Sequence, residues 1–405
     1  MIERQLFNSL DINRKKEFIK EKTLRKVQEA YDHSEFYRCL YRSHKVNPHR
    51  FKELSDLSYL PIINKRDILD NTNKLLLEYI DRDHLISANT GGSTGNPLKL
   101  YRTKEEMAEE YAYLDYYLKY DMNIKFKRKI ILRGNSSNDD LFRRFGCNLI
   151  LSSQLINRDN ILSVAEEIKK FNPQLLHAYP SSILKMTELI NRFNLHLNIP
   201  NILTSSEMIT KKQLDILRAT YCANVIDLYG NSEHSVLAIN TGDAYNFDLT
   251  YGYTEFIEGK IISTKLLSSP MPLIRYDCGD TYSKTSILCN DLTNKVLESI
   301  GGREIEYVYD KNNNKLPVVS IILGQHYSFF DSVIDYSLVQ NMPGELIIEY
   351  VSNKAINNFD IDSAIRKMNI ITKSSLSLKF KKVEKIRLSN NGKKEFVYRN
   401  GDKFE

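Results

Sequence analysis

The chain has 405 residues, of which 42% are hydrophobic and 27% are charged, as in ordinary globular proteins and unlike disordered or fibrous ones. At about 100–200 residues per domain, this length predicts two or three domains. The net charge of +6 is small for the length, which argues against a dedicated nucleic-acid-binding protein. The five cysteines form no CxxC pair, which argues against a structural zinc site and against a disulfide framework.

The first residues lack the apolar stretch of a signal peptide, and no apolar run approaches the length of a membrane-spanning helix. We therefore expect a cytoplasmic protein with no membrane span and no nucleic-acid partner. The oligomeric state stays open, with a homodimer as one candidate, because the 25 tyrosines and 17 phenylalanines can fill either cores or interfaces.

The first 60 residues have the apolar spacing of helices, with Leu24, Val27 and Ala30 on one face. Asn64 is the expected N-cap of a further helix. Residues 98–101 then predict a strand. Thr103 and Glu106 predict a capping box that opens the next helix.

Between residues 129 and 230, short apolar runs alternate with helical stretches. The predicted strands are residues 129–133, 148–153, 174–179, 201–205 and 223–230. The predicted helices are residues 160–171, 180–193 and 210–221, the last opened by a capping box of Thr210 and Gln213. This alternation is typical of a parallel, doubly wound sheet.

Residues 251–300 have the pattern of β-hairpins, and the last hundred residues place short strands around one helix. We therefore predict an α/β fold with two domains. The large N-terminal domain, 1–303, holds doubly wound, mostly parallel sheets and a small β-rich subdomain at about 245–300. The small α+β C-terminal domain, 304–405, is expected to be a mobile lid.

Three polar loops follow predicted strands, where ligands bind in open parallel sheets. They contain His177 with Tyr179, Ser206 with Glu207, and the run 229–234. We predict that these loops converge on one crevice. The alternative interpretation is that they are only polar connections and that His177 is a hydrogen-bonded core residue.

A glycine cluster, TGGSTGNPLK at 90–99, holds three of the sixteen glycines within five residues. Glycines let backbone N–H groups approach an anion, and the hydroxyls between them add donors to phosphate oxygens. Ser93 also lies in a Gly-x-Ser-x-Gly pattern, that of a hydrolase nucleophile elbow. Such an elbow runs from strand into helix, whereas Pro97 and the residues after it predict strand–loop–strand. A structural turn without a ligand is the third interpretation.

Two further segments suit nucleotide contacts. Asp280 follows a glycine at the end of a predicted strand and could accept hydrogen bonds from ribose hydroxyls. Arg303 follows two glycines at the expected domain junction and could contact phosphate. In isolation, each is also compatible with a turn or a surface ion pair.

In chain order, these segments resemble motifs of the adenylate-forming enzymes, in particular the phenylacetate–CoA ligase branch with its CapK-like capsule-biosynthesis members. The resemblance covers nearly the whole chain and rests on EFYRCLYR with LPIINKRDIL, TGGSTGNPLKL, YGNSEH, RYDCGD, GGRE and NNGKKEF. It implies a ligase that uses ATP and Mg²⁺ to convert a carboxylic acid into acyl-AMP, releasing pyrophosphate. The acyl group then passes to an acceptor.

The resemblance also implies roles for individual residues. The ATP phosphates would lie against Thr90, Gly92, Ser93, Thr94 and Gly95. The rest of the nucleotide pocket would be formed by Ser206, Glu207, Tyr229, Gly230, Asn231 and Ser232, with Asp280 on the ribose and Arg303 nearby. Glu233 would coordinate Mg²⁺, Lys393 or its neighbour Lys394 would be the catalytic lysine, and Glu306 the hinge. His177 and Tyr179 are candidates for the wall of the acyl pocket.

The chain departs from the family at three points. Glu306 stands where an aspartate hinge is usual, Asp277-Cys278 replaces common Arg/Thr-like pairs, and the chain is shorter than most acyl–CoA synthetases. The expected acceptor is an amine in polysaccharide or secondary-metabolite biosynthesis. CoA is the alternative, as in phenylacetate–CoA ligase. A serine hydrolase acting through Ser93 and a non-catalytic nucleotide-binding homologue are the remaining alternatives.

Overall fold

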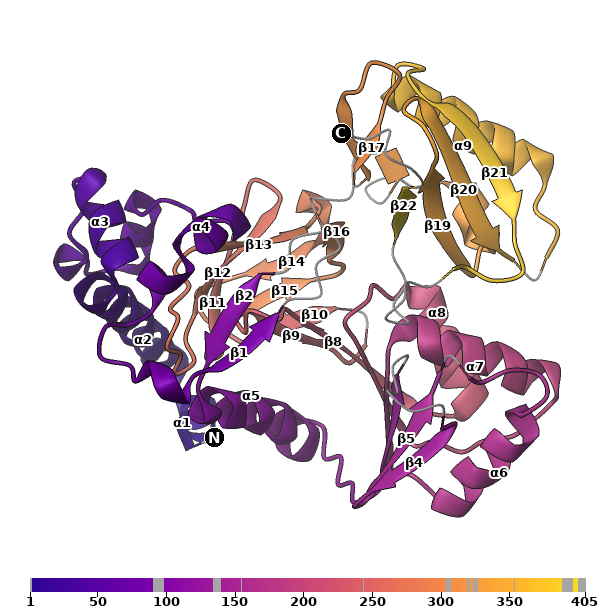
Figure 1. Cartoon of the computed structure of the whole chain (residues 1–405), viewed down its shortest axis with the longest axis horizontal. Coiled ribbons are helices and arrows are strands. Elements are labelled where there is room, and N and C mark those ends of the chain that lie inside the picture. The colour runs from indigo at the N-terminus through magenta and orange to yellow at the C-terminus, as the bar shows by residue number, and fades with distance from the viewer. Residues whose placement is uncertain are drawn as a thin grey trace. The chain divides into compact units, whose positions relative to one another are not determined.

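The computed structural model describes residues 2–89, 98–133, 140–153, 155–242, 244–303, 307–318, 321–322, 327–352, 354–387 and 396–399. The chain, drawn in Figure 1, divides into two units. Unit 1 comprises Met1–Lys125 and Leu228–Ile300, and unit 2 comprises Phe126–Asp227 and Gly301–Glu405. The chain returns from unit 2 to unit 1 within strand β8 (Asn224–Gly230). The predicted domain boundary at 303/304 stays a prediction.

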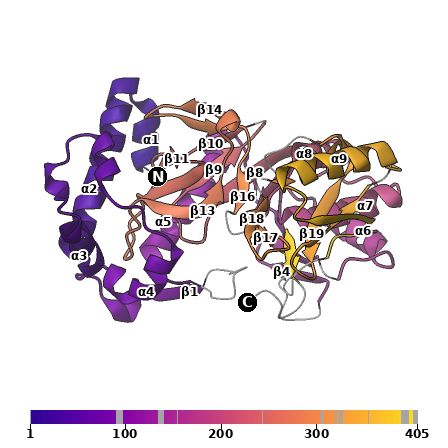
Figure 2. The ribbon, with the colours of Figure 1, turned by 90° about the horizontal axis from the view of Figure 1, so that it is seen from above.

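Unit 1 opens with helices, drawn in Figure 2, whose buried side chains join one hydrophobic core. They are α1 (Ile2–Ser9), α2 (Ile12–His33), α3 (Glu35–Ser43) and α4 (Lys65–Leu75), followed later by α5 (Lys104–Tyr116). Helix α2 buries Leu24, Val27 and Ala30, as their spacing predicts. The N-cap prediction for Asn64 is also confirmed, because its side chain accepts hydrogen bonds from the first N–H groups of α4.

The strands of unit 1 form antiparallel sheets, which confirms the β-rich prediction for residues 251–300. One sheet joins β11 (Gly252–Ile257), β12 (Lys260–Lys265) and β13 (Tyr276–Thr281). A second set comprises β9 (Leu237–Asn240), β10 (Tyr245–Phe247), β15 (Lys295–Leu297) and β14 (Ile287–Asn290). A separate hairpin pairs β1 (Ile86–Asn89) with β2 (Lys99–Arg102).

Unit 2 contains the predicted doubly wound sheet. Its strands are β3 (Lys129–Arg133), β5 (Asn148–Ser152), β6 (Leu175–Ala178) and β7 (Asn201–Ser205), with β3–β5, β3–β6 and β6–β7 parallel. The connecting helices are α6 (Ile161–Phe171), α7 (Pro180–Arg192) and α8 (Lys211–Tyr221). The capping box of Thr210 and Gln213 is present as predicted. Sequence analysis did not predict β4 (Phe142–Phe145), which pairs antiparallel with β5 as the last strand of the sheet.

The C-terminal part of unit 2 is α+β, as expected. It holds β16 (Gly301–Arg303), β17 (Tyr307–Tyr309), β18 (Lys315–Pro317), β19 (Asp335–Gln340), β20 (Glu345–Val351), α9 (Asn358–Ile371), β21 (Ser377–Lys382) and β22 (Val397–Arg399). Four strands form a sheet in the order β21-β20-β19-β22. Helix α9 contributes Ala364 and Met368 to the core that this sheet buries.

The predicted capping box at the start of α5 is only half correct. The Thr103 hydroxyl accepts a hydrogen bond from the Glu106 N–H, as expected for an N-cap. The Glu106 carboxylate does not return to the backbone. The carboxylate is fully buried and bonds the side chains of Lys265 on β12 and of Ser269 in the segment after it. The Lys265 ammonium is distant in the sequence but lies within hydrogen-bonding reach of Glu106.

Within the described ranges, no helix combines the length and the apolar composition needed to cross a lipid bilayer.

Candidate active site

The glycine cluster stands in the chain between two strands, as the sequence predicts for the segment after it. Strands β1 and β2 flank it and pair antiparallel, with Asn89 opposite Lys99. A nucleophile elbow needs a helix directly after the loop, and the chain enters β2 instead. This setting argues against a serine hydrolase. The cluster members Thr90, Gly92, Ser93, Thr94 and Gly95 lie outside the described residues, as do Glu306, Lys393 and Lys394.

Tyr229 and Asp280 come together in unit 1. The Tyr229 hydroxyl, at the end of β8, donates a 2.8 Å hydrogen bond to Oδ2 of Asp280 on β13. Both side chains are half-buried. The Tyr229 ring packs edge-on against Tyr245 and Phe247, which fixes its plane. The pair therefore presents an aromatic ring and an oriented carboxylate side by side.

A second carboxylate–tyrosine pair uses the same two elements. The Tyr276 hydroxyl, at the start of β13, donates a 3.1 Å hydrogen bond to Oε1 of Glu233 in the loop after β8. Burial first, and then the nearby Glu233 carboxylate, raise the pKa of Tyr276. The hydroxyl therefore stays protonated at neutral pH and acts as a donor to Glu233.

The loop from Asn231 to Ser235 is held by its own hydrogen bonds. The Asn231 side chain accepts from the Ser235 N–H at 3.0 Å and donates to the Ser235 hydroxyl at 2.8 Å. Arg102 on β2 donates to the Ser232 carbonyl, which ties this loop to the hairpin that flanks the glycine cluster. Gly230, Asn231 and Ser232 thus lie in one hydrogen-bonded segment with Glu233, and their binding role stays a prediction.

Beneath this loop lies a buried charged cluster that the sequence analysis missed. Lys265 at the end of β12 bonds the Glu106 carboxylate at 2.5 Å, and the Ser269 hydroxyl donates to its other oxygen at 2.9 Å. Nδ1 of His234, the residue after Glu233, lies 3.4 Å from the same carboxylate. Lys265 and Glu106 are 4% and 0% exposed. The cluster links α5 and β12 to the binding loop.

The charge state of Glu106 follows from these contacts. Burial by itself would raise the pKa of Glu106, but the Lys265 ammonium, the nearby His234 ring and hydrogen bonds from Lys265 and Ser269 outweigh it and lower the pKa to about 2. Glu106 is therefore ionised at neutral pH. No local sequence pattern indicates the Glu106–Lys265 pair, because the two residues are 159 apart in the chain.

In unit 2, the predicted residues follow the carboxyl ends of parallel strands. Nε2 of His177, on β6, lies 3.0 Å from the hydroxyl of Ser205, on β7. The Ser205 hydroxyl is in turn 3.5 Å from that of Ser206, which adopts a left-handed backbone with φ of 71°. His177 is half-buried and hydrogen-bonded, so the structure is compatible with both the pocket-wall and the core interpretations.

Glu207 and Tyr179 lie around the start of α7. Tyr179 is the N-cap residue of this helix, which begins at Pro180. The Glu207 carboxylate accepts hydrogen bonds from both the N–H and the hydroxyl of Ser181 at 2.9 Å. It therefore caps the helix N-terminus, where the backbone carries partial positive charge. For Arg303, in β16, the structure describes the backbone position alone.

The carboxylates of unit 1 suit Mg²⁺ delivered with a triphosphate. Mg²⁺ usually binds through one or two protein carboxylates and takes its other ligands from phosphates and water. Glu233 offers one oriented carboxylate. Across the described part of the chain, no group of three or more His, Cys, Asp or Glu side chains forms a protein-only metal cage. One protein carboxylate fits a Mg²⁺ ion that takes its remaining ligands from the phosphates of a nucleotide and from water.

No family model matches the chain. Over 390 residues the chain is 24% identical to Protein CapK of Staphylococcus aureus, covering 91% of this chain and 85% of CapK.

Solved structures of 2-hydroxyisobutyryl-CoA ligase share the fold. The postadenylation state in complex with 2-HIB-AMP matches with a TM-score of 0.68 at 15% identity, covering 98% of this chain and 91% of that one. An open conformation in complex with 2-HIB-AMP and CoA matches with a TM-score of 0.58 at 16% identity, covering 94% and 90%. The chain is thus similar in sequence to Protein CapK, and it shares the fold of 2-hydroxyisobutyryl-CoA ligase.

Proposed function

We propose that the chain is an ATP- and Mg²⁺-dependent ligase that activates a carboxylic acid as acyl-AMP, releases pyrophosphate and transfers the acyl group to an acceptor. The observation that carries the proposal is the pair of tyrosine-held carboxylates in unit 1. Glu233 is held by Tyr276 and Asp280 by Tyr229. Both carboxylates come from the two motifs, YGNSEH and RYDCGD, that would bind Mg²⁺ and ribose.

In the proposed reaction, a substrate carboxylate oxygen forms a bond to the α-phosphorus of ATP while the bond from that phosphorus to the bridging oxygen breaks. Pyrophosphate leaves with that oxygen, and no proton transfer is needed. Catalysis is then mostly positioning and stabilisation of charge on phosphate oxygens. Bound Mg²⁺ would supply charge neutralisation on those oxygens.

The chain's own residues would divide the work of binding. Asp280 would accept hydrogen bonds from the ribose hydroxyls, and the Tyr229 hydroxyl would keep its carboxylate oriented. Tyr276 would hold Glu233 towards the metal. The loop 90–95 would surround the phosphates, with Ser206 and Glu207 along the nucleotide and His177 and Tyr179 along the acyl group.

Lys393 belongs to the proposed lid, 304–405, and would bridge the carboxylate and the α-phosphate. A lysine this far along the chain reaches a site formed by earlier residues through closure of the lid, for which Glu306 is the proposed pivot. The large domain in this proposal is 1–303.

For the acceptor, we propose an amine in polysaccharide or secondary-metabolite biosynthesis, in the cytoplasm. CoA is the second candidate, because the ligase of similar fold was solved with CoA. Mass spectrometry of the product, with CoA or an amine supplied to the enzyme-bound adenylate, distinguishes the two acceptors.

The activation step is tested by ATP–pyrophosphate exchange across a panel of carboxylic acids. We expect at least one acid to support Mg²⁺-dependent exchange. A Glu233→Gln variant is expected to lose at least tenfold in exchange rate and to need a higher Mg²⁺ concentration, because an amide is a much weaker Mg²⁺ ligand than a carboxylate. If no acid of the panel stimulates ATP–pyrophosphate exchange, the proposal is contradicted.

Glu298→Gln is the matched control for this experiment. Glu298 belongs to the same unit, and its side chain is exposed. It lies outside the proposed site, so its loss of charge should leave the exchange rate and the Mg²⁺ requirement unchanged. Equal losses in the two variants would remove Glu233 from the metal site.

A further inference from the structure

A cationic recess lies in unit 2 and shares no residue with the candidate active site. Its volume is about 500 Å³. Three segments form it: the residues before β3, the β4–β5 hairpin and the C-terminal end of α6. The lining residues are Lys127, Arg128, Arg144, Gly146, Cys147, Lys170, Phe171 and Asn172. We call this recess, with the exposed hairpin tip beside it, the β4–β5 basic surface.

The cations of this surface exceed what local structure requires. Arg144 pairs with Glu167 at 2.6 Å, and Nε of Arg128 donates to the Asn172 carbonyl at 2.8 Å. Lys170 lies in the last turn of α6, where a cation offsets the helix dipole. Among the residues that the structure describes, neither Lys127 nor Lys170 has an ion pair within 4 Å.

Three more cations lie on or next to the same segments in the chain. They are Lys129, Arg143 and Lys169, while the neighbouring acids of α6 are Glu166 and Glu167. These segments therefore carry seven cations and two carboxylates, one of which already pairs with Arg144. Such an excess favours an anionic partner with several charges.

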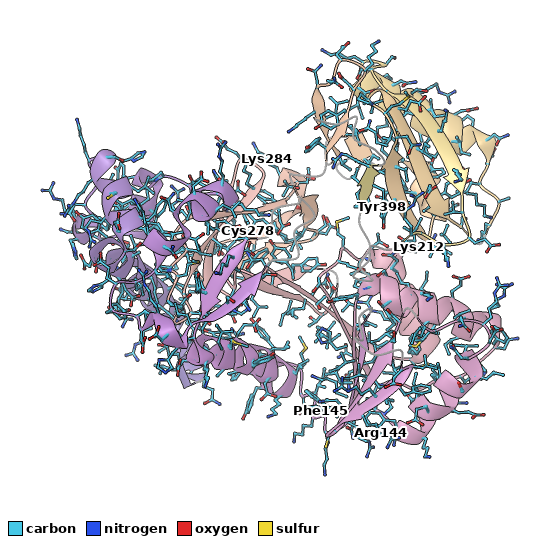
Figure 3. All side chains as sticks on the ribbon, viewed as in Figure 1. Arg144, Phe145, Lys212, Cys278, Lys284 and Tyr398 are labelled. Atoms are coloured by element: carbon cyan, nitrogen blue, oxygen red, sulfur yellow. The ribbon has the colours of Figure 1, made fainter. Side chains whose placement is uncertain are left out.

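The hairpin tip adds an apolar side chain to this charge. Phe145, the last residue of β4, is 68% exposed, and Arg144 precedes it on the same strand (Figure 3). The turn continues through Gly146, whose backbone has φ of 56° and whose Cβ position has open space around it. The Phe145 ring follows two arginines, and its exposed apolar area is unfavourable in water unless a partner covers it.

We propose that the β4–β5 basic surface binds anionic phospholipid bilayers, with the cations on lipid phosphates and Phe145 in the interfacial layer. Stable attachment of a peripheral protein takes two signals, and this surface supplies both charge and an apolar side chain. Phe145 favours a bilayer over a soluble polyanion, because a polyanion without an apolar layer leaves the ring in water. The inference is independent of the proposed ligase chemistry.

The test is co-sedimentation of the full-length protein with vesicles at about 0.1 M salt. Vesicles of phosphatidylglycerol and phosphatidylcholine should bind the protein, whereas pure phosphatidylcholine should not. Each cation removed should weaken partitioning onto the anionic vesicles about fivefold. The double variant Lys127→Gln/Lys170→Gln should therefore partition roughly 25-fold more weakly than the wild type. Phe145→Ser leaves the charge unchanged and should weaken partitioning onto the vesicles several-fold.

Lys373→Gln/Lys382→Gln is the matched control, because both lysines are exposed in unit 2 outside this surface. It should bind vesicles like the wild type, and circular dichroism of all variants should report unchanged folding. Equal binding to neutral vesicles, equal losses in the two double variants or an unaltered Phe145→Ser variant would overturn the proposal. So would binding to single-stranded nucleic acid or heparin with no binding to vesicles, which would assign the surface to a soluble polyanion.

Discussion

A Lys393→Ala variant is expected to form the acyl-adenylate two to three orders of magnitude more slowly than the wild type, with little change in ATP binding. A lysine about 4 Å from the charge on the α-phosphate, at an effective dielectric constant near 20, contributes at most roughly 4 kcal/mol. Each ~1.4 kcal/mol is worth tenfold in rate, so the upper limit is about a thousandfold. Single-turnover formation of acyl-AMP, with equilibrium binding of ATP, measures both effects.

Lys394→Ala is the control for this prediction because it removes the same charge one residue away. We expect less than a fivefold effect from it. A large loss in Lys394→Ala with a small one in Lys393→Ala would transfer the catalytic role to the neighbour. Losses below fivefold in both variants would remove this segment from the mechanism.

Lys265→Met is expected to lower the free energy of unfolding of unit 1 by about 3–5 kcal/mol. The substitution leaves the Glu106 carboxylate buried without its cation, and an unpaired buried charge is strongly destabilising. Replacing both partners, as in Glu106→Leu/Lys265→Met, should restore most of the loss because no unpaired charge is left. Urea unfolding followed by tyrosine fluorescence measures the difference.

Lys260→Met provides a matched control on the same strand. Lys260 pairs with Asp277 at 3.3 Å and its side chain is 37% exposed, so its loss should cost less than about 1 kcal/mol. Equal losses of unfolding free energy in Lys260→Met and Lys265→Met would show that the buried Glu106–Lys265 pair stabilises the fold no more than the exposed pair does.

The pH dependence of stability offers an independent readout of the same cluster. The pKa of Glu106 is lowered in the folded chain to about 2, from 4.5. Its contribution to stability is therefore complete above pH 4.5 and is lost as the pH falls towards 2. Glu106→Gln should lack this component between pH 4.5 and 2, whereas Glu298→Gln should retain it.

Local rules explain which parts of the fold could be predicted from the sequence. The Thr210–Gln213 capping box and the Asn64 N-cap depend on residues within one helical turn, and both are present. The strands and helices of unit 2 follow from apolar runs of the right length. Strand β4 was missed because its sequence, FRRF, is largely exposed and carries no apolar alternation.

Long-range pairing explains what the sequence analysis missed at the site. Glu106 satisfies the local capping rule, but its carboxylate instead bonds Lys265, because a cation that shares its buried environment stabilises it more than a backbone N–H does. Glu233 was recognised from its motif, whereas Tyr276, which lies in the RYDCGD motif, was given no role. The two residues are 43 apart in the chain, and no periodicity connects them.

Photolabelling with 2-azido-ATP in the presence of Mg²⁺ tests the central claim, that the segments around Tyr229 and Asp280 bind the nucleotide. The account predicts saturable labelling of the peptide that contains Tyr229, protection by excess ATP and at least tenfold weaker labelling in Asp280→Ala. Saturable labelling confined to peptides of unit 2, with Asp280→Ala labelled like the wild type, would contradict it.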